Sequence, residues 1–173
     1  MKEPFKNILV YLDGSEESIV ASMAAITLAL RLDAHLTAMY VVNTKALQEL
    51  VKARIFLEFE EQEYRRDIEG DARRYLDHVE KMAIQKGVSC TLEKRSGTVQ
   101  TEVRQYVQDH DVDILVLGGL SQIHSRRDEL MNEADRIMRS ATCPVLVVRD
   151  NDDIWDTFES LPNVPVGGES DDT

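Results

Sequence analysis

The segment DILVLGGLSQIHSRRDELMN, which spans Asp113 to Asn132, begins with the residue types of a phosphate-binding element. An apolar run rich in Ile, Leu and Val leads directly into Gly118 and Gly119. Glycines after a buried strand let backbone N–H groups approach phosphate oxygens, and the N-terminus of a following helix favours an anion. Beyond them, Arg126 and Arg127 are followed by acids and a helical pattern. The segment therefore either binds phosphate or keeps only the scaffold of such a site.

Residue types that could carry other chemistry do not converge. The four histidines form no pair at i, i+4 spacing and no metal-binding motif. They are His35, His78, His110 and His124. Ser15 and Ser121 lack evident His and Asp partners, so nucleophilic catalysis has no support. The motifs G-x-x-x-x-G-K-[ST] and G-x-G-x-x-G are both absent. We therefore predict no catalytic residues and no metal site.

The composition indicates one globular domain with an acidic end. A chain of 173 residues with 43% hydrophobic and 30% charged residues is ordinary for a protein of this kind. The net charge of −12 argues against a nucleic-acid-binding or anionic-membrane-binding surface. Most of this charge comes from residues 150–173, which contain eight acids and no Lys or Arg. No apolar run suits a leader or a membrane span, so we expect no membrane insertion and a cytoplasmic location.

The two cysteines, Cys90 and Cys143, are too few for a disulfide framework and lack the spacing of a metal site. Both lie in strand-like runs. We predict that they are buried free thiols, because free cysteine behaves as a small apolar side chain.

Five short apolar runs predict strands, at residues 6–15, 34–43, 88–97, 112–119 and 143–150. Between them, four apolar stripes at helical spacing begin at Ile19, Ile68, Val99 and Leu130. The segment ALQELVKARIFLEFEEQEY (residues 46–64) is apolar but less regular. It could form an extra helical turn, a flap over the sheet, or part of a dimer surface. The charge run at residues 60–74 alternates in sign and is interpreted as a solvated helix face.

Strands that alternate with helices predict an α/β fold, with a doubly wound, five-stranded parallel sheet and helices on both faces. In such sheets, ligands bind beyond the carboxyl ends of the strands, where the strand order reverses. In this chain that position corresponds to Asp13, Val41 and the residues from Gly118 to Ser121.

Several of these runs are similar to segments of a known family. NILVYLDGSEES resembles the first strand and turn of universal stress proteins, and DILVLGG and ATCPVLVVRD resemble their fourth and fifth strands. The resemblance covers roughly Phe5 to Arg149. It implies an adenine nucleotide alpha hydrolase-like fold for a domain at residues 1–149. Residues 150–173 lie outside the resemblance, and their composition predicts an acidic, flexible tail.

The resemblance also implies where a nucleotide would bind. In the family, an Asp after the first strand and a Val near the end of the second contact adenosine, and Asp13 and Val41 match those positions. Both residues also have structural explanations. Asp-Gly-Ser is a common turn and helix cap, and Val41 would be buried in any case.

Nucleotide-binding members of the family carry the loop pattern G-x-x-G-x(9)-G-[ST]. Counted back from the Cys-Pro before the last strand, the first glycine is Gly118, and the later motif positions are Ser121, Met131 and Asn132. The spacing is therefore kept, but two of the three glycines and the final hydroxyl are replaced. This predicts no bound cofactor; the alternative is weak binding of ATP or AMP.

The last predicted strand, CPVLVVRD, would be an unpaired edge rich in valine, which is an aggregation hazard unless it is covered. Family members commonly pair this strand with its copy. We therefore expect a homodimer through Val145, Leu146, Val147 and Val148.

The residues beyond Asp150 combine acids, prolines and a Gly-Gly pair, a composition that disfavours independent folding. We expect this tail to bind an unidentified protein partner or to aid solubility. The alternative is that its apolar residues, which include the only Trp, pack back on the domain or on the dimer mate.

Three functional hypotheses remain. The first is a non-catalytic, dimeric stress-response protein of this family that acts through partners without a nucleotide. The second is a nucleotide sensor of the same family that uses a degenerate loop. The third, a nucleotide-using enzyme on a related scaffold, has the least support, because nothing nucleophilic or metal-binding converges.

Overall fold

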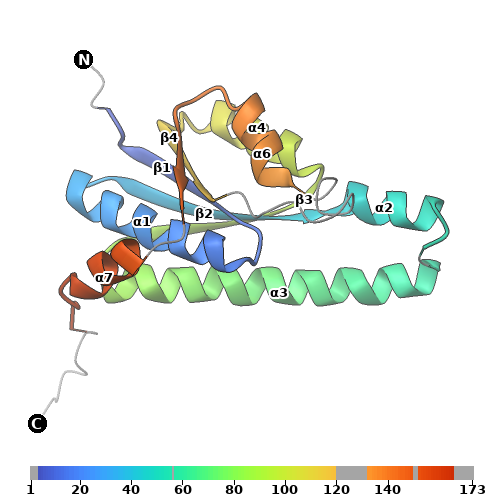
Figure 1. The fold of residues 1–173 in the computed structure, drawn as a ribbon, viewed down its shortest axis with the longest axis horizontal. Helices are drawn as coiled ribbons and strands as arrows, with labels where there is room; N and C mark the ends of the chain where they lie inside the picture. Colours follow the sequence, from blue (N-terminus) through green and yellow to red (C-terminus); the bar gives the residue numbers. More distant parts are fainter. Residues whose placement is uncertain (1–3, 56, 120–131, 150–151, 166–173) are drawn as a thin grey trace, which may run out of the picture.

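The computed structural model describes residues 4–55, 57–119, 132–149 and 152–165. Its centre is a five-stranded parallel sheet with the strand order β3-β2-β1-β4-β5 (Figure 1). The strands are β1 (Asn7–Leu12), β2 (His35–Asn43), β3 (Cys90–Gly97), β4 (Ile114–Gly118) and β5 (Val145–Val148). All five lie within the predicted runs, and the predicted α/β fold with a parallel sheet is confirmed.

Helices cover both faces of the sheet (Figure 1). On one face lie α1 (Glu16–Leu32), α3 (Glu58–Gln85) and α7 (Asp152–Ser160), and on the other lie α4 (Val99–Asp109) and α6 (Glu133–Ser140). The strand order reverses between β1 and β4, which are neighbours at the centre of the sheet. Any ligand site of the usual kind for this fold is therefore expected at the carboxyl ends of these central strands.

The central strand β1 contributes to two separate apolar clusters, one on each face. Ile8, Val10 and Leu12 belong to the cluster under α1 and α3, while Leu9 and Tyr11 belong to the cluster under α4 and α6. All five are at most 4% exposed. Successive side chains of a strand point to opposite faces, so a strand that is covered on both sides becomes a continuous apolar run.

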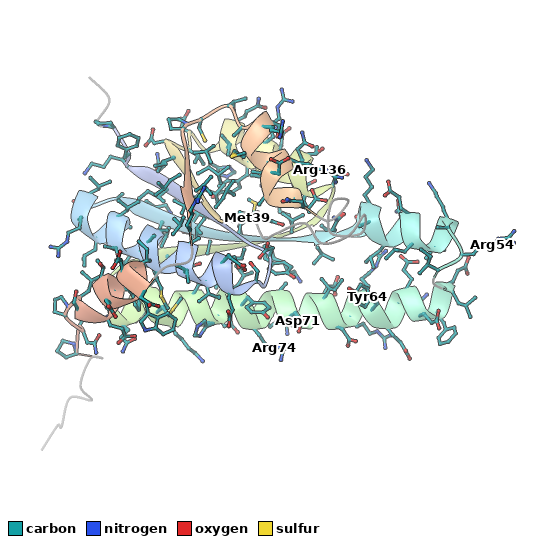
Figure 2. The ribbon with its side chains drawn as sticks, viewed as in Figure 1. Met39, Arg54, Tyr64, Asp71, Arg74 and Arg136 are labelled. Atoms are coloured by element: carbon teal, nitrogen blue, oxygen red, sulfur yellow. The ribbon has the colours of Figure 1, made fainter. Side chains whose placement is uncertain are left out.

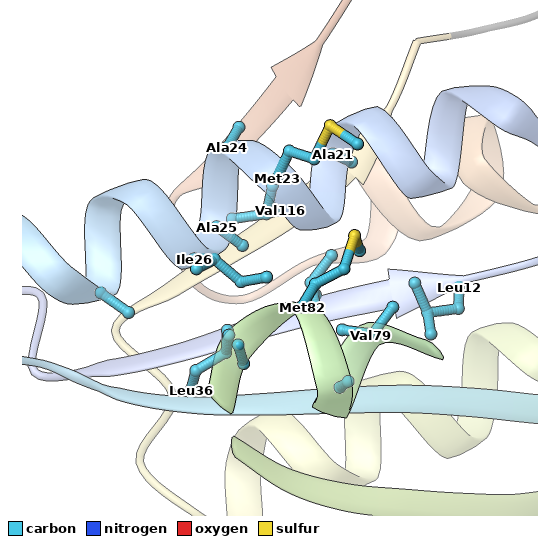
Figure 3. Packing of buried hydrophobic residues seen from close by; sticks show 14 of the residues in the cluster. Leu12, Ala21, Met23, Ala24, Ala25, Ile26, Leu36, Val79, Met82 and Val116 are labelled. Carbon is cyan, nitrogen blue, oxygen red and sulfur yellow. The ribbon is translucent and has the colours of Figure 1, made fainter. Parts of the chain in front are cut away.

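Small residues let α1 lie close to the sheet. Ala21 and Ala25 are fully buried beside Ile26, and Val79 and Met82 of α3 pack into the same cluster (Figure 3). The helix begins at the predicted cap, where the Ser15 hydroxyl accepts a hydrogen bond from the backbone N–H of Ser18 at 3.2 Å.

The irregular apolar segment forms an additional helix, α2 (Thr44–Lys52), and the start of α3. These parts lie side by side beyond the end of the sheet (Figure 1). Only Leu47 of α2 is buried, whereas Ile55, Leu57 and Phe59 at the α2–α3 connection are each more than half exposed. The extra element is therefore a full helix that projects from the domain.

The described part of the C-terminal segment packs on the domain, which corrects the prediction of a free tail for residues 152–165. Phe158 and Leu161 are 3% and 4% exposed and join the core cluster of α1 and α3. The buried ammonium of Lys86 donates hydrogen bonds to the Leu161 carbonyl at 2.7 Å and to Asn163 Oδ1 at 2.9 Å. The apolar stripe of α7 thus outweighs the acidic composition. The remainder of the predicted tail lies outside the described residues.

Among the described residues, no helix combines the length and the apolar character that crossing a bilayer requires.

Candidate functional site

A cavity of about 260 Å³ lies at the carboxyl ends of β1 and β2. Its walls come from these two strand ends, the middle of α3 and the first turns of α4 and α6. The lining residues are Tyr11, Asp13, Tyr40, Val41, Asn43, Tyr64, Ile68, Asp71, Val99 and Glu133. Figure 2 locates Tyr64 and Asp71 on α3. The cavity brings together Asp13 and Val41, two of the residues predicted at the strand ends, whereas Gly118 at the end of β4 is not among the described lining residues.

Asp13 lies in a tight turn that fixes its carboxylate. Its Oδ1 accepts hydrogen bonds from the backbone N–H of Ser15 at 2.9 Å and from the Ser15 hydroxyl at 2.5 Å. Both bonds use one oxygen, so the other is available to a ligand. The turn requires Gly14, because its φ is +83° and an added Cβ would lie 2.8 Å from the ring of Tyr75. Asp13 therefore has a structural role and also lines the cavity.

Val41 combines the same two roles. It is 4% exposed, belongs to the apolar cluster under α4 and α6, and pairs with Arg95 of β3 in the sheet register. Its place near the end of β2 makes it part of the cavity wall. Burial alone accounts for a valine here, as the sequence suggested.

The two described positions of the loop pattern, Gly118 and Asn132, serve the scaffold. A Cβ on Gly118 would lie 2.7 Å from the carbonyl carbon of Glu17, so the end of β4 must be a glycine to meet the first turn of α1. Asn132 is the N-cap of α6, and its Oδ1 accepts a hydrogen bond from the backbone N–H of Asp135 at 3.2 Å. The other two positions, Ser121 and Met131, lie outside the described residues.

Several cavity residues were not predicted as site residues. Tyr64, Ile68, Asp71 and Tyr75 follow one another on α3 at spacings of four, three and four, which places them on one helical face. The first three line the cavity, and the ring of Tyr75 stacks parallel to that of Tyr40 with centroids 6.4 Å apart. Ile68 and Tyr75 belong to the predicted apolar stripe, whereas Tyr64 and Asp71 lie in the charge run interpreted as a solvated face. The helical spacing that joins all four residues is the available signal.

The cavity has a negative electrostatic character. Burial, followed by the nearby carboxylates of Asp71 and Asp13, raises the pKa of the Tyr40 phenol to about 12. Burial, followed by Asp13 and Glu133, raises the pKa of Tyr11 well above its ordinary value. Both phenols are therefore neutral at physiological pH and can donate hydrogen bonds.

Two arginines outside the lining offset part of this charge. Arg74 pairs with Asp71, and Arg136 Nη1 lies 3.2 Å from Glu133 Oε1. The carboxylate of Asp13 accepts hydrogen bonds from the neutral groups of Ser15. Among the described residues that line the cavity, none is Lys or Arg.

Asn43 forms part of the wall between this cavity and a second one. Its Oδ1 caps α2 by accepting from the backbone N–H of Ala46 at 3.0 Å, and its Nδ2 donates to Glu133 Oε1 at 3.1 Å. The second cavity has a volume of about 290 Å³ and is lined by Asn43, Lys45, Ala46, Glu49, Thr98, Gln100, Glu133 and Arg136. Asn43 and Glu133 thus face both cavities.

The described residues contain no group of three His, Cys, Asp or Glu side chains placed to hold a metal ion. The described histidines lie away from the cavity lining. His35 Nε2 lies 3.0 Å from Thr91 Oγ1, and the ring of His110 stacks on Tyr106. The fourth histidine, His124, lies outside the described residues.

Both cysteines are free, as predicted, but each is partly rather than fully buried. The difference arises because Cys90 begins the edge strand β3 and Cys143 precedes the edge strand β5. Burial raises the pKa of the Cys90 thiol to about 11 and raises that of Cys143 above its ordinary value. Both are therefore protonated, weakly nucleophilic thiols at neutral pH.

Comparison with known proteins decides the family. The model of the universal stress protein family matches residues 4–149. The chain belongs to this family. Universal stress protein MJ0531 of Methanocaldococcus jannaschii is 29% identical over 145 residues, which cover 84% of this chain and 82% of that protein. Universal stress protein YxiE of Bacillus subtilis is 27% identical over 151 residues, which cover 84% and 99%.

Solved structures of universal stress proteins and related chains show the same fold. Hypothetical protein MJ0577 superposes with a TM-score of 0.65 at 17% identity, covering 86% of this chain and 99% of that one. A universal stress protein from Arabidopsis thaliana with AMP bound superposes with a TM-score of 0.57 at 18% identity, covering 86% and 94%. The family match ends at residue 149, so the packed segment with α7 lies beyond it.

Proposed function

We propose that this universal stress protein is a non-catalytic regulatory protein of the stress response, which acts as a homodimer and does not hold ATP in its cavity. The observation that carries the proposal is the lining of the cavity. Asp13, Asp71 and Glu133 face it, and no Lys or Arg stands among its described lining residues. With adenosine at Asp13 and Val41, the phosphates of ATP would extend towards the loop pattern. There Glu133 directly follows Asn132 and presents a carboxylate in place of the cations or open backbone amides of a usual phosphate site.

The size of this effect can be estimated. Two like unit charges about 4 Å apart repel by roughly 4 kcal/mol at an effective dielectric constant of about 20. Arg74 and Arg136 reduce the repulsion but already pair with Asp71 and Glu133. The replacement of two loop glycines by Ser121 and Met131 in the sequence supports the same conclusion, because side chains occupy positions where backbone would approach phosphate.

The alternative is an adenine-nucleotide sensor that uses a degenerate loop. Its support is that Asp13 and Val41 line one cavity at the strand ends, as nucleotide binding in this family requires, and that the Arabidopsis relative has AMP bound. A monophosphate brings less charge into the cavity than ATP. AMP is therefore the nucleotide that this alternative favours.

Calorimetric titration with ATP and Mg²⁺, and separately with AMP, tests the proposal. We expect no binding of ATP in the micromolar range, and micromolar affinity would replace the proposal by the sensor function. The double change Met131→Gly with Asn132→Ser is the companion experiment, since serine keeps a capping oxygen for α6. This variant is expected to bind ATP more tightly than the unmodified protein.

The proposed dimer uses β5, which is an edge strand of the sheet. Val145, Leu146 and Val147 are only partly buried, so pairing with a second copy would cover an exposed apolar edge. Light scattering should give the mass of a dimer, whereas Val147→Pro removes a backbone donor and should give a monomer or aggregate. A monomer across a wide concentration range for the unmodified protein would contradict this assembly.

The free thiols of Cys90 and Cys143 support a cytoplasmic setting for this function, since thiols are kept reduced there. An unidentified protein partner remains part of the proposal. The described part of the acidic segment is packed on the domain, so a partner would meet the exposed acidic side of α7 and not a free tail.

A further inference from the structure

We propose that the cavity at the ends of β1 and β2 binds a compact organic cation that carries a methylated ammonium group, with tyrosine side chains around the cation and the carboxylates of Asp13 and Asp71 balancing its charge. This inference rests on the proposed function, because a cavity that held ATP would have another ligand.

The size of the cavity limits the ligand. Its volume of about 260 Å³ is slightly below the range of roughly 300 to 1,000 Å³ that is typical of pockets for drug-sized ligands. A single branched ammonium group with a short substituent is therefore a better fit than a complete nucleotide.

The aromatic lining supplies the first part of the recognition. Tyr11, Tyr40 and Tyr64 come from β1, β2 and α3 and line the same small space. Tyr11 and Tyr40 are 4% and 8% exposed, whereas Tyr64 is 38% exposed and therefore offers the most ring surface. The ring of Tyr40 is held in place by its parallel stack with Tyr75. Aromatic side chains that surround a cavity are a known way to bind quaternary ammonium ions, since the ring quadrupole attracts the cation without direct hydrogen bonds.

The carboxylates supply the second part. Asp13, Asp71 and Glu133 reach the cavity from three different elements, and the last two each have an arginine partner. The hydrogen bonds that hold Asp13 come from the neutral groups of Ser15. A carboxylate held by neutral donors beside tyrosine rings can attract a bound positive charge.

The raised pKa of Tyr40 reflects the negative electrostatic potential in the cavity. The carboxylates of Asp71 and Asp13 act with burial to raise the pKa of Tyr40 to about 12, which means that they disfavour a negative charge at its oxygen. The same negative potential stabilises a cation in the adjoining space. The described residues contain no group of three carboxylate, His or Cys side chains placed to hold a metal ion, so a ligand with a diffuse charge fits better than a metal ion.

Calorimetry with choline and tetramethylammonium as probes tests the inference, with 3,3-dimethyl-1-butanol as the neutral isostere of choline. We expect both cations to bind and the neutral alcohol to bind at least about tenfold more weakly, and the affinity to fall as salt is added. Failure of both cations to bind at millimolar concentrations would overturn the inference, as would equal binding of the neutral isostere.

Variants on α3 provide the matched comparison. Asp71→Asn and Tyr64→Leu change lining residues and should each weaken choline binding by about fivefold to tenfold. Asp67→Asn removes an exposed carboxylate one turn away that does not line the cavity, and should leave choline affinity unchanged. Equal effects of Asp71→Asn and Asp67→Asn on choline affinity would contradict a role of Asp71 in the cavity. If Asp71→Asn does not fold, Tyr64→Leu provides the same test.

Titration of the same samples with ATP and Mg²⁺ separates the two proposals. Binding of choline without binding of ATP supports both. If neither ligand binds, the cation inference fails while the proposed function stands. Micromolar binding of ATP overturns the proposed function, and the inference survives that result only if choline competes with ATP.

Discussion

Asn43 Nδ2 donates a hydrogen bond to Glu133 Oε1 over 3.1 Å, and this bond joins the end of β2 to the first turn of α6. The two residues are 90 positions apart in the chain, yet together they face both cavities. Asn43 also caps α2 through its other side-chain atom, so one amide fixes a helix start and part of a cavity wall.

The first prediction separates these two roles of Asn43. Asn43→Ser keeps a capping oxygen for α2 but removes the donor to Glu133, whereas Asn43→Ala removes both. We expect the free energy of unfolding to fall by about 1 kcal/mol more for Asn43→Ala than for Asn43→Ser. Urea denaturation of the three proteins measures the difference. Equal stabilities for the two variants would mean that the cap at α2 contributes nothing.

The second prediction concerns the buried lysine under the C-terminal segment. Lys86→Met removes both hydrogen bonds from the ammonium to Leu161 and Asn163 and its position over the ring of Phe158. We expect a loss of about 2–3 kcal/mol in the free energy of unfolding, because removal of a buried, charged donor leaves its two acceptors unpaired. Lys81→Met is the control on an exposed position of the same helix, and it should change stability by less than about 0.5 kcal/mol.

Two glycines with opposite surroundings provide the third prediction. Gly70 lies within α3 with nothing inside 4 Å of an added Cβ, so Gly70→Ala should stabilise the protein by about 0.5–1 kcal/mol. Gly118→Ala should destabilise it, since the new Cβ would overlap the backbone of Glu17. Thermal unfolding of both variants checks the signs. A stabilising Gly118→Ala would show that β4 and α1 can separate at no cost.

The fourth prediction follows from the raised pKa of Cys90. With a pKa of about 11 against an ordinary value near 9, the folded thiol should react with iodoacetamide much more slowly at pH 8 than the same thiol in denatured protein. The rate should rise as the pH approaches 11. The folded state holds this proton more tightly than the unfolded state does. The resulting contribution to the free energy of unfolding is therefore fully present below about pH 9 and is lost as the pH rises towards 11. Fast alkylation of the native protein at pH 8 would contradict this assignment.

The sequence predicted the sheet because its strands are apolar runs bounded by turn residues, and the burial of β1 on both faces explains why that signal is strong. It also located Ser15 as a cap and Asp13 and Val41 at the strand ends. Local patterns of this kind depend on neighbours in the chain, so they can be recognised from the sequence without knowledge of the fold.

The missed features depend on contacts between distant segments. Asp71 belongs to a run of alternating charge, and it becomes a cavity residue only because α3 packs against β2 and borders the cavity at the ends of β1 and β2. Phe158 lies among acids whose composition resembles a free tail. Its burial depends on the packing of α7 against α1 and on Lys86 at the end of α3. The α2 helix was ambiguous because Leu47 is its one buried residue.

The contact between Lys86 and the C-terminal segment also sets an order of events during translation. Lys86 is synthesised 75 residues before Leu161, which at about 5–20 residues per second means a delay of roughly 4–15 s. Until then the end of α3 lacks the carbonyl and the ring that later cover its ammonium. A nascent chain halted near residue 150 would therefore hold all five strands and still expose an unfinished apolar surface.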